Sequence, residues 1–240
     1  MDGAQIRPNQ RVLDLMCGNG NLSKSLIERH HGIKDSLEIH GIDISEVQIR
    51  IGASLLGDEP GIFLRAGDAA EMAYPNHYFD SILRKSSSHE VRPPLQRKIL
   101  DEAYRTLKPS GRFVDLTMLF DDVAERNDFY ELTSLKDLMG GLHDLFENRH
   151  FYMHSEYFPM LRDVGFRDIE VLREFNYKID LEYALSVYFK GDERKFDHFH
   201  ECARSLDSLV DGKIYYICEE GRHFLMPPAN IVRMRKSGVE

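Results

Sequence analysis

The chain has 240 residues, enough for one well-cored domain with insertions, and its 42% hydrophobic and 30% charged residues are ordinary for a globular protein. No apolar run approaches the roughly 18 residues that a membrane span needs, which argues against an integral membrane protein. The formal net charge of −9 disfavours a large nucleic-acid surface. We therefore expect a single domain over residues 1–240, with neither a membrane nor a nucleic acid as partner.

The cysteines and the N-terminal residues indicate a compartment. Cys17, Cys202 and Cys218 are odd in number and lack the spacing of metal ligands, so we expect neither a metal site nor a disulfide framework. The first residues lack the apolar segment of a signal peptide. Free thiols are typical of a reducing environment, and the sequence therefore predicts a cytoplasmic protein.

Residues 11–23 have the pattern of a short buried strand, a glycine turn and the start of a helix. The apolar run that ends at Leu15 is typical of a strand. Gly18 and Gly20 permit a tight turn and let a ligand approach the backbone. A strand, a glycine loop and a helix N-terminus together form the usual scaffold of a nucleotide site.

Two residues of this stretch indicate which nucleotide would bind. A dinucleotide site has a third glycine where this chain has Ser23. Asp14 stands at the end of the strand, where a carboxylate would repel a pyrophosphate but attract an ammonium group. S-adenosylmethionine carries an ammonium group and no phosphate, so the residues favour that cofactor. A purely structural turn is the alternative.

Strands and helices alternate through the N-terminal half of the chain. The pattern predicts strands over residues 37–43, 62–66, 79–83 and 112–119, helices over 23–31, 46–56 and 93–107, and a turn over 108–111. Ser45 and Gln48 form a capping box at the start of the second helix. Alternating strands and helices imply parallel βαβ units, and therefore a doubly wound α/β sheet.

The C-terminal half adds helical segments to this pattern. Residues 121–150 have a helical pattern, with a helix start at 134–137 and a break at Gly140 and Gly141. Further along we expect a helix that ends near Gly165, a strand over 168–175, helices over 181–189 and from 193 to about 217, and a last strand over 229–236. The segments 121–155 and 180–218 are therefore predicted to be helical insertions.

Six stretches resemble, in the same order, the motifs of class I S-adenosylmethionine-dependent methyltransferases. They are residues 12–20, 40–45, 67–69, 79–82, 107–113 and 161–166. The resemblance implies a doubly wound, seven-stranded Rossmann-like sheet whose last strand runs antiparallel between the fifth and sixth. The chain departs from the family at Met16, where the family usually has glycine. The Met16 side chain would either crowd the amino-acid end of the cofactor or pack beneath it.

Each expected cofactor contact has a chemical reason. Asp43, 23 residues after Gly20, can accept both ribose hydroxyls, although a cap of the next helix is the alternative. Asp68 can accept from the adenine amino group, with a simple turn as the alternative. The cofactor-binding residues that we predict are Asp14, Cys17, Gly18, Asn19, Gly20, Asp43, Ile44, Asp68, Ala69 and Arg84, with Ile44 and Ala69 on either side of the adenine.

The segment after the fourth strand lies beside the switch point of a doubly wound sheet, where ligands bind. It contains His89, whose imidazole titrates near neutral pH and makes it the candidate general base. The alternative is a histidine without chemical function, because methyl transfer often needs only positioning and exclusion of water. Ser88, His154 and Tyr157 are the predicted acceptor contacts, with Arg149 and Tyr188 as further candidates.

The two insertions are rich in aromatic residues and follow strands at the ligand end of the sheet, so we expect a lid over the acceptor. Packing onto the sheet, or a homodimer contact, is the alternative. By analogy the function is methyl transfer to a small molecule, since no base-methylation motif follows the fourth strand. Two other functions stay open: an enzyme that modifies the cofactor itself, and a non-catalytic cofactor-binding module for a protein partner.

Overall fold

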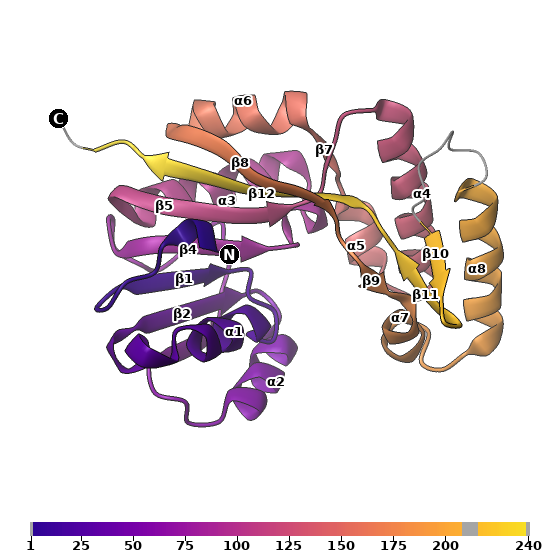
Figure 1. Cartoon of the computed structure of the whole chain (residues 1–240), viewed down its shortest axis with the longest axis horizontal. Coiled ribbons are helices and arrows are strands. Elements are labelled where there is room, and N and C mark those ends of the chain that lie inside the picture. The colour runs from indigo at the N-terminus through magenta and orange to yellow at the C-terminus, as the bar shows by residue number, and fades with distance from the viewer. Residues whose placement is uncertain (1, 208–215, 239–240) are drawn as a thin grey trace.

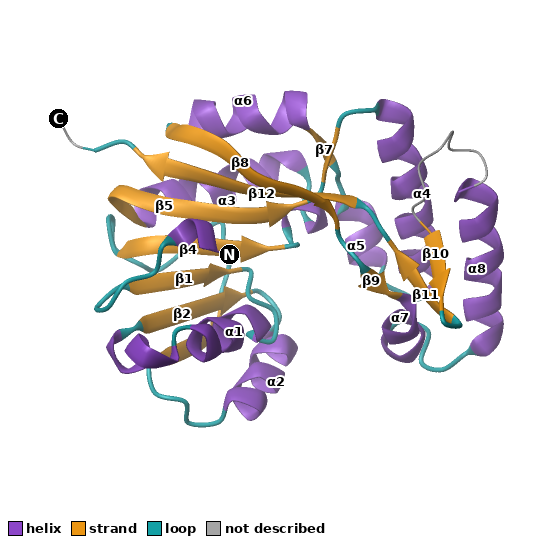
Figure 2. Ribbon diagram, viewed as in Figure 1, coloured by secondary structure: helices purple, strands orange, loops and turns teal. Residues whose placement is uncertain are grey.

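The centre of the molecule is a mixed sheet with helices on both faces (Figures 1 and 2). The computed structural model describes residues 2–207 and 216–238. Within these residues the sheet has seven strands in the order β3-β2-β1-β4-β5-β12-β8. Their bounds are β1 Arg11–Leu15, β2 Glu38–Asp43, β3 Ile62–Ala66, β4 Phe79–Lys85, β5 Leu107–Thr117, β8 Phe166–Asn176 and β12 Pro228–Lys236.

The pairing of the strands confirms the predicted fold class. Strands β1 to β5 pair in parallel, while β12 runs antiparallel to both β5 and β8. The chain moves outward from β1 to β3 and then crosses back to β4 on the other side of β1. The carboxyl ends of β1 and β4 therefore flank the switch point at which ligands bind in such sheets.

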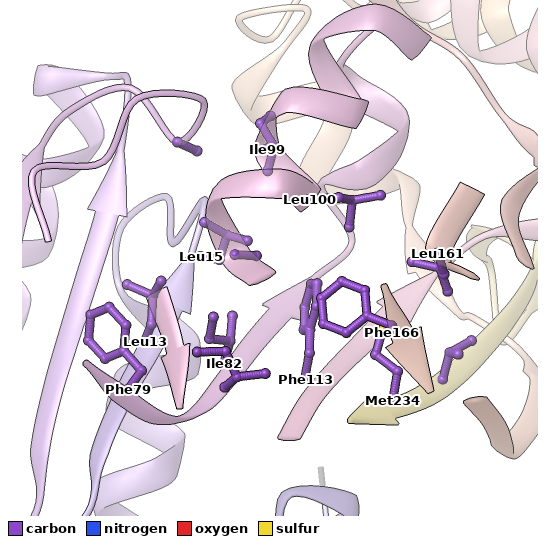
Figure 3. Packing of buried hydrophobic residues seen from close by; sticks show 14 of the residues in the cluster. Leu13, Leu15, Phe79, Ile82, Ile99, Leu100, Phe113, Leu161, Phe166 and Met234 are labelled. Atoms are coloured by element: carbon purple, nitrogen blue, oxygen red, sulfur yellow. The ribbon is translucent and has the colours of Figure 1, made fainter. Parts of the chain in front are cut away.

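Alternate residues of the strands point to opposite faces, which divides the core in two. On one face Leu13 and Leu15 pack with helix residues such as Ile99 and Leu161, as Figure 3 shows. On the other face Val12 packs with Leu26 and its neighbours. The helices concerned are α3 Pro93–Thr106 and α6 His154–Val164 on the first face and α1 Asn21–Arg29 on the second, while α2 Glu46–Leu56 packs on β3.

A buried ion pair joins two central strands to two helices. Arg84 of β4 and Asp115 of β5 stand opposite each other, and the guanidinium binds the carboxylate through Nε at 3.0 Å and Nη2 at 2.6 Å. Gln96 of α3 accepts from Arg84 Nη1, and the Tyr157 hydroxyl of α6 donates to Asp115. None of these four side chains is exposed to solvent. The network therefore fixes the position at which β4 ends.

The two insertions pack on each other beside the carboxyl edge of the sheet, to the right in Figure 1. Leu132 of the first insertion shares a cluster with Phe196 and Phe199 of the second. The elements within and next to the insertions are β6 Leu119–Phe120, α4 Val123–Met139, α5 His143–Asn148, β7 Tyr152–Met153, β9 Ile179–Asp180, α7 Leu181–Val187, α8 Glu193–Asp207, β10 Tyr216–Glu219 and β11 Arg222–Leu225. Among the described helices, none combines the length and apolarity needed to cross a membrane.

Three predictions of local structure are wrong. The predicted helix start at 134–137 lies inside α4, because Asp122 already caps that helix by accepting from the Glu125 amide. Residues 108–111, predicted to form a turn, belong to β5. The strand is irregular there, and Ser110 adopts a φ of 61°. The helix predicted up to residue 217 ends at Asp207. Residues 208–215 lie outside the described ones, and β10 follows, pairing with β11 against the α8 cluster.

Replacing Asp115 by asparagine is expected to lower the free energy of unfolding by about 3–5 kcal/mol, because the Arg84 charge then lacks its buried counter-ion. Urea denaturation followed by circular dichroism measures the change. Asp101→Asn is the matched control, since the Arg97–Asp101 pair lies on an exposed helix surface and should leave stability nearly unchanged. Equal effects of the two substitutions would contradict a structural role for the buried pair.

Candidate active site

A cavity of about 950 Å³ lies at the carboxyl ends of β1, β2 and β4. The N-terminal half of the chain supplies one wall, and the two insertions together with Tyr177 supply the other. The lining residues include Asp14, Met16, Cys17, Gly18, Asn19, Asp43, Ile44, Ser45, Gln48, Lys85, Ser86, Ser87 and Glu90, together with residues 141–145, Tyr177, Tyr183 and Tyr188. Most of the cofactor contacts predicted from the first two motifs are therefore brought together in one place.

The two glycines of the turn, Gly18 and Gly20, are required for different structural reasons. Gly18 adopts a φ of 54°, and a Cβ added there would meet nothing within 4 Å, so its backbone faces open space in the cavity wall. At Gly20, with a φ of 74°, an added Cβ would come within 3.1 Å of Leu56 and Leu64. Gly20 is thus required by the packing of α2 and β3, and it does not line the cavity.

Met16 occupies the position where the resembling family usually has glycine. Its φ of 57° lies in the left-handed region that favours glycine, so the methionine is held in a strained backbone conformation. The side chain packs against the core cluster that contains Leu13 and Leu15, and it also lines the cavity. Met16 therefore packs beneath the site while still forming part of its wall.

Asp14 is almost fully buried at the base of the cavity. Its Oδ2 accepts hydrogen bonds from the Ser23 amide at 3.0 Å and the Ser23 hydroxyl at 2.7 Å. Burial raises the pKa of Asp14 to about 6, against the lowering effect of the Ser23 hydrogen bonds. A cationic group in the cavity would stabilise the ionised form. Ser23, which replaces the third glycine of a dinucleotide motif, thus has a definite role as the partner of Asp14.

Asp43 holds the glycine turn and the start of α2 together. Its Oδ2 accepts from the Gly18 amide at 2.8 Å, and its Oδ1 accepts from the Ser45 amide at 2.9 Å. Ser45 in turn caps α2 by accepting from the Gln48 amide, as its position in the capping box predicted. The carboxylate of Asp43 also lines the cavity, where its lone pairs can accept from a ligand.

The remaining predicted site residues lie elsewhere. Asp68 is exposed and accepts from the Ala70 amide within its own turn, while Ala69 is buried in the core, and neither lines the cavity. Arg84 and Tyr157 belong to the buried network described above. Ser88 bonds to Thr117 at 2.6 Å, and His154 bonds to Asp121 at 2.7 Å. No group of three or more metal-ligating side chains occurs among the described residues.

A second cavity, of about 360 Å³, adjoins the first and shares six lining residues with it. The shared residues are Ser86, Glu90, Leu145, Tyr177, Tyr183 and Tyr188. Half of the other lining residues are apolar, among them Met118, Phe129 and Phe151. The polar ones are His89, Thr133, Lys136, Arg149, Lys178 and Asp180. Of the predicted acceptor contacts, only the two further candidates, Arg149 and Tyr188, reach this cavity.

His89, the predicted general base, is buried in the wall of the second cavity. Its ring stacks on Phe151 with 5.2 Å between centroids. Burial lowers the pKa of His89 well below its ordinary value, and the charges of Arg149 and Lys136 lower it further. Its Nδ1 has no hydrogen-bond partner within the described part of the chain. His89 is therefore neutral near pH 7 and a weak base.

Glu90 is the titratable group that the sequence prediction missed. It lies in the wall that the two cavities share, and burial raises its pKa to about 7 against the opposing charges of Arg149 and Lys136. A carboxylate with a pKa near the working pH is well suited to general-base chemistry. The sequence feature that could have identified Glu90 is its position directly after His89, in the segment that follows the fourth strand.

Comparison with known proteins agrees with this geometry. A family of methyltransferase domains matches residues 12–111. The demethylmenaquinone methyltransferase of Symbiobacterium thermophilum is 32% identical over 114 residues, which are 46% of this chain and 43% of the relative. The chain thus spans about half the length of the curated relatives it matches.

Two solved structures share the fold. The YcgJ protein from Bacillus subtilis has a TM-score of 0.76 at 17% identity and aligns over 98% of this chain and 95% of its own. The [4+2]-cyclase SpnF has a TM-score of 0.64 at 16% identity and aligns over 99% and 79%, respectively. Residues 12–111 thus match a family of methyltransferase domains, and the strand order of the whole sheet agrees with the fold of these two solved structures.

Replacing Met16 by glycine is expected to give a protein more stable by about 1 kcal/mol than replacing it by alanine, because only alanine keeps a Cβ at positive φ. Both variants lose the packing of the methionine side chain, so the comparison isolates the backbone. Urea denaturation of the two variants measures the difference. At Ala53, on the exposed surface of α2, the order should reverse, with alanine more stable than glycine. The same order at both positions would argue against strain at Met16.

Replacing Glu90 by glutamine is expected to stabilise the protein at pH 8 by about 1–3 kcal/mol and to have little effect near pH 4.5. The pKa of Glu90 is raised by folding, so its contribution to stability is lost as pH rises from its unfolded value towards 7. Urea denaturation at the two pH values, compared between variant and wild type, gives the difference. The exposed Glu147→Gln serves as control and should show no such trend. A Glu90→Gln effect independent of pH would contradict the raised pKa.

Proposed function

We propose that the protein is an S-adenosylmethionine-dependent methyltransferase that acts on a small-molecule acceptor. The carrying observation is the pair of adjoining cavities at the switch point of the sheet, joined along a wall that contains Ser86, Glu90 and Tyr188. The larger one, which we term the cofactor cavity, is lined by the motif residues. The smaller one, which we term the acceptor cavity, is mostly apolar. Cofactor and acceptor would meet at the shared wall.

The charge of the cofactor cavity supports this assignment. Its lining includes the carboxylates of Asp14, Asp43 and Asp144, against which Lys85 is the one Lys or Arg among the described lining residues. An acidic cavity disfavours a pyrophosphate and favours the ammonium and sulfonium groups of S-adenosylmethionine. In the proposal Asp43 accepts from the ribose hydroxyls and Asp14 faces the ammonium group.

The chain's own residues would supply positioning and a base. When bound, S-adenosylmethionine provides a methyl group on a sulfonium, which is a good leaving group. Tyr177, Tyr183 and Tyr188 line both cavities and would exclude water from the line of transfer. Glu90 would take the acceptor's proton as the methyl group is transferred.

The two insertions supply residues 141–145, Tyr183 and Tyr188 to these walls, and Tyr177 lies between the two insertions in the chain. They belong to one packed cluster in which α4 contacts α8. We therefore retain the lid as part of the proposal, with the segments 121–155 and 180–218 acting as one unit over the bound molecules. Such a unit would close the site after binding and open for product release.

The acceptor of the curated relatives does not transfer directly to this chain. One relative is named for demethylmenaquinone, but the matched domain ends at Gly111, and most of the acceptor cavity is built from residues 118–225. A quinone-like acceptor is therefore a second candidate that rests on the relatives alone.

The cofactor-modifying alternative loses its support, because Arg84, one of its two basic residues, is bound to Asp115 inside the core.

Calorimetric titration with S-adenosylhomocysteine tests the proposal, and we expect binding in the micromolar range. Asp43→Asn should weaken it by about 1–3 kcal/mol, because the charged hydrogen-bond acceptor for the ribose is lost. The exposed Asp58→Asn is the matched control and should bind like wild type. If the folded protein binds neither S-adenosylhomocysteine nor S-adenosylmethionine, the methyltransferase function is wrong, and the partner-binding module becomes the better hypothesis.

A further inference from the structure

Three charged side chains form a buried cluster at the polar end of the acceptor cavity. Asp137 has no exposed surface, and its Oδ1 accepts from Lys136 Nζ at 2.6 Å while its Oδ2 accepts from Arg149 Nε at 2.5 Å. The side chain of Lys136 is 13% exposed and that of Arg149 is 4% exposed. One carboxylate thus pairs with two cations, and the cluster of three side chains has a net charge of one positive unit.

The geometry turns the positive groups towards the cavity. Lys136 and Arg149 line it, whereas Asp137 does not, so the carboxylate lies behind the two cations. Arg149 bonds to Asp137 only through Nε, and the described residues offer its two terminal nitrogens no further hydrogen-bond partner. Burial lowers the pKa of Lys136, with the nearby Arg149 charge acting in the same direction. A buried cluster of this kind is stabilised by an anion that binds to its cavity side.

Among the described residues, no other charged group of the cavity makes an ion pair with this cluster. Lys178 pairs with Glu219, and Asp180 pairs with Arg222, so these groups at the cavity rim are already balanced. Glu90 lies in the shared wall, makes no hydrogen bond or ion pair through its carboxyl group among the described residues, and has a pKa raised to about 7. Burial therefore outweighs the attraction of the two cations for the Glu90 carboxylate.

Aromatic rings surround the cationic cluster. The Lys136 ammonium lies 4.2 Å from the centre of the Tyr188 ring, and the Arg149 guanidinium lies 5.9 Å from that of Phe151. Phe129 and Met118 extend the apolar wall. A ligand that fits these walls has a flat apolar body and a single negative charge, because the cluster has one positive charge to offer.

We propose that the methyl acceptor is an aromatic carboxylate whose carboxylate group is bound by Lys136 and Arg149. This inference rests on the proposed function, since it names the acceptor class of the same site. Lys136 and Arg149 line only the acceptor cavity and not the cofactor cavity, whereas Glu90 lines both. The carboxylate is therefore held away from the cofactor cavity, and the atom that accepts the methyl group lies towards Glu90, at another position of the acceptor.

The test uses three probes of one shape, 2-naphthoate, 2-naphthamide and 2-naphthol, each titrated calorimetrically into the protein saturated with S-adenosylhomocysteine. Only 2-naphthoate is anionic at pH 7.5, so it should bind at least about tenfold more tightly than the two neutral probes, which is the scale of one charge-assisted hydrogen bond. In Lys136→Gln, which leaves Asp137 paired with Arg149, this preference should fall by about tenfold.

The control variant is Lys178→Gln, which removes the same charge from the rim of the same cavity and should leave the preference unchanged. Arg149→Gln should lose the preference as well, and its circular dichroism spectrum establishes whether it folds. Failure of 2-naphthoate to bind, equal affinity for all three probes, or a preference lost in Lys178→Gln but kept in Lys136→Gln would overturn the proposal. Absence of S-adenosylhomocysteine binding would instead overturn the proposed function.

Discussion

The buried ion pair between Arg84 and Asp115 is the interaction on which the site depends. Two opposite charges taken out of water at this depth are tolerated because Gln96 and Tyr157 satisfy their remaining hydrogen-bonding atoms. The pair joins β4 to β5 and ties both to helices on one face of the sheet. Because β4 ends one residue later, at Lys85, the pair also determines where Ser86 and Glu90 enter the cavities.

The two cavities differ in charge in a way that suits two different ligands. Asp14 and Asp43 make the cofactor cavity acidic, whereas Lys136 and Arg149 give the acceptor cavity a cationic end. Glu90 stands between them with a pKa near neutrality. In the proposed function, this arrangement would separate a cationic cofactor from an anionic acceptor and would leave a proton acceptor at their junction. In a site shielded from water these charges act more strongly than they would in solution.

The fold by itself does not decide the reaction. SpnF shares the fold with a TM-score of 0.64 and is named a [4+2]-cyclase, which shows that the same framework serves other chemistry. The matched methyltransferase domain covers residues 12–111, where the cofactor motifs lie. The acceptor cavity is built mainly from the later segments. The insertions therefore determine which acceptor can bind, since they supply most of the groups that an acceptor would meet.

The sequence by itself determined the parallel sheet, the order of its motifs and the turn from Asp14 to Gly20, because these depend on local periodicity and on residues close together in the chain. It also predicted the cap at Ser45, whereas the antiparallel last strand was implied by the resemblance to a known family. It did not reveal that Arg84 and Tyr157 belong to the core, since their partner Asp115 is distant in sequence and only the pairing of β4 with β5 brings it near. Arg149 was already a candidate from the sequence, but the surroundings of Glu90 and Lys136 became visible only when tertiary packing brought α4 and α5 against the switch point, because burial and neighbouring charges, rather than residue type, decide how such groups behave.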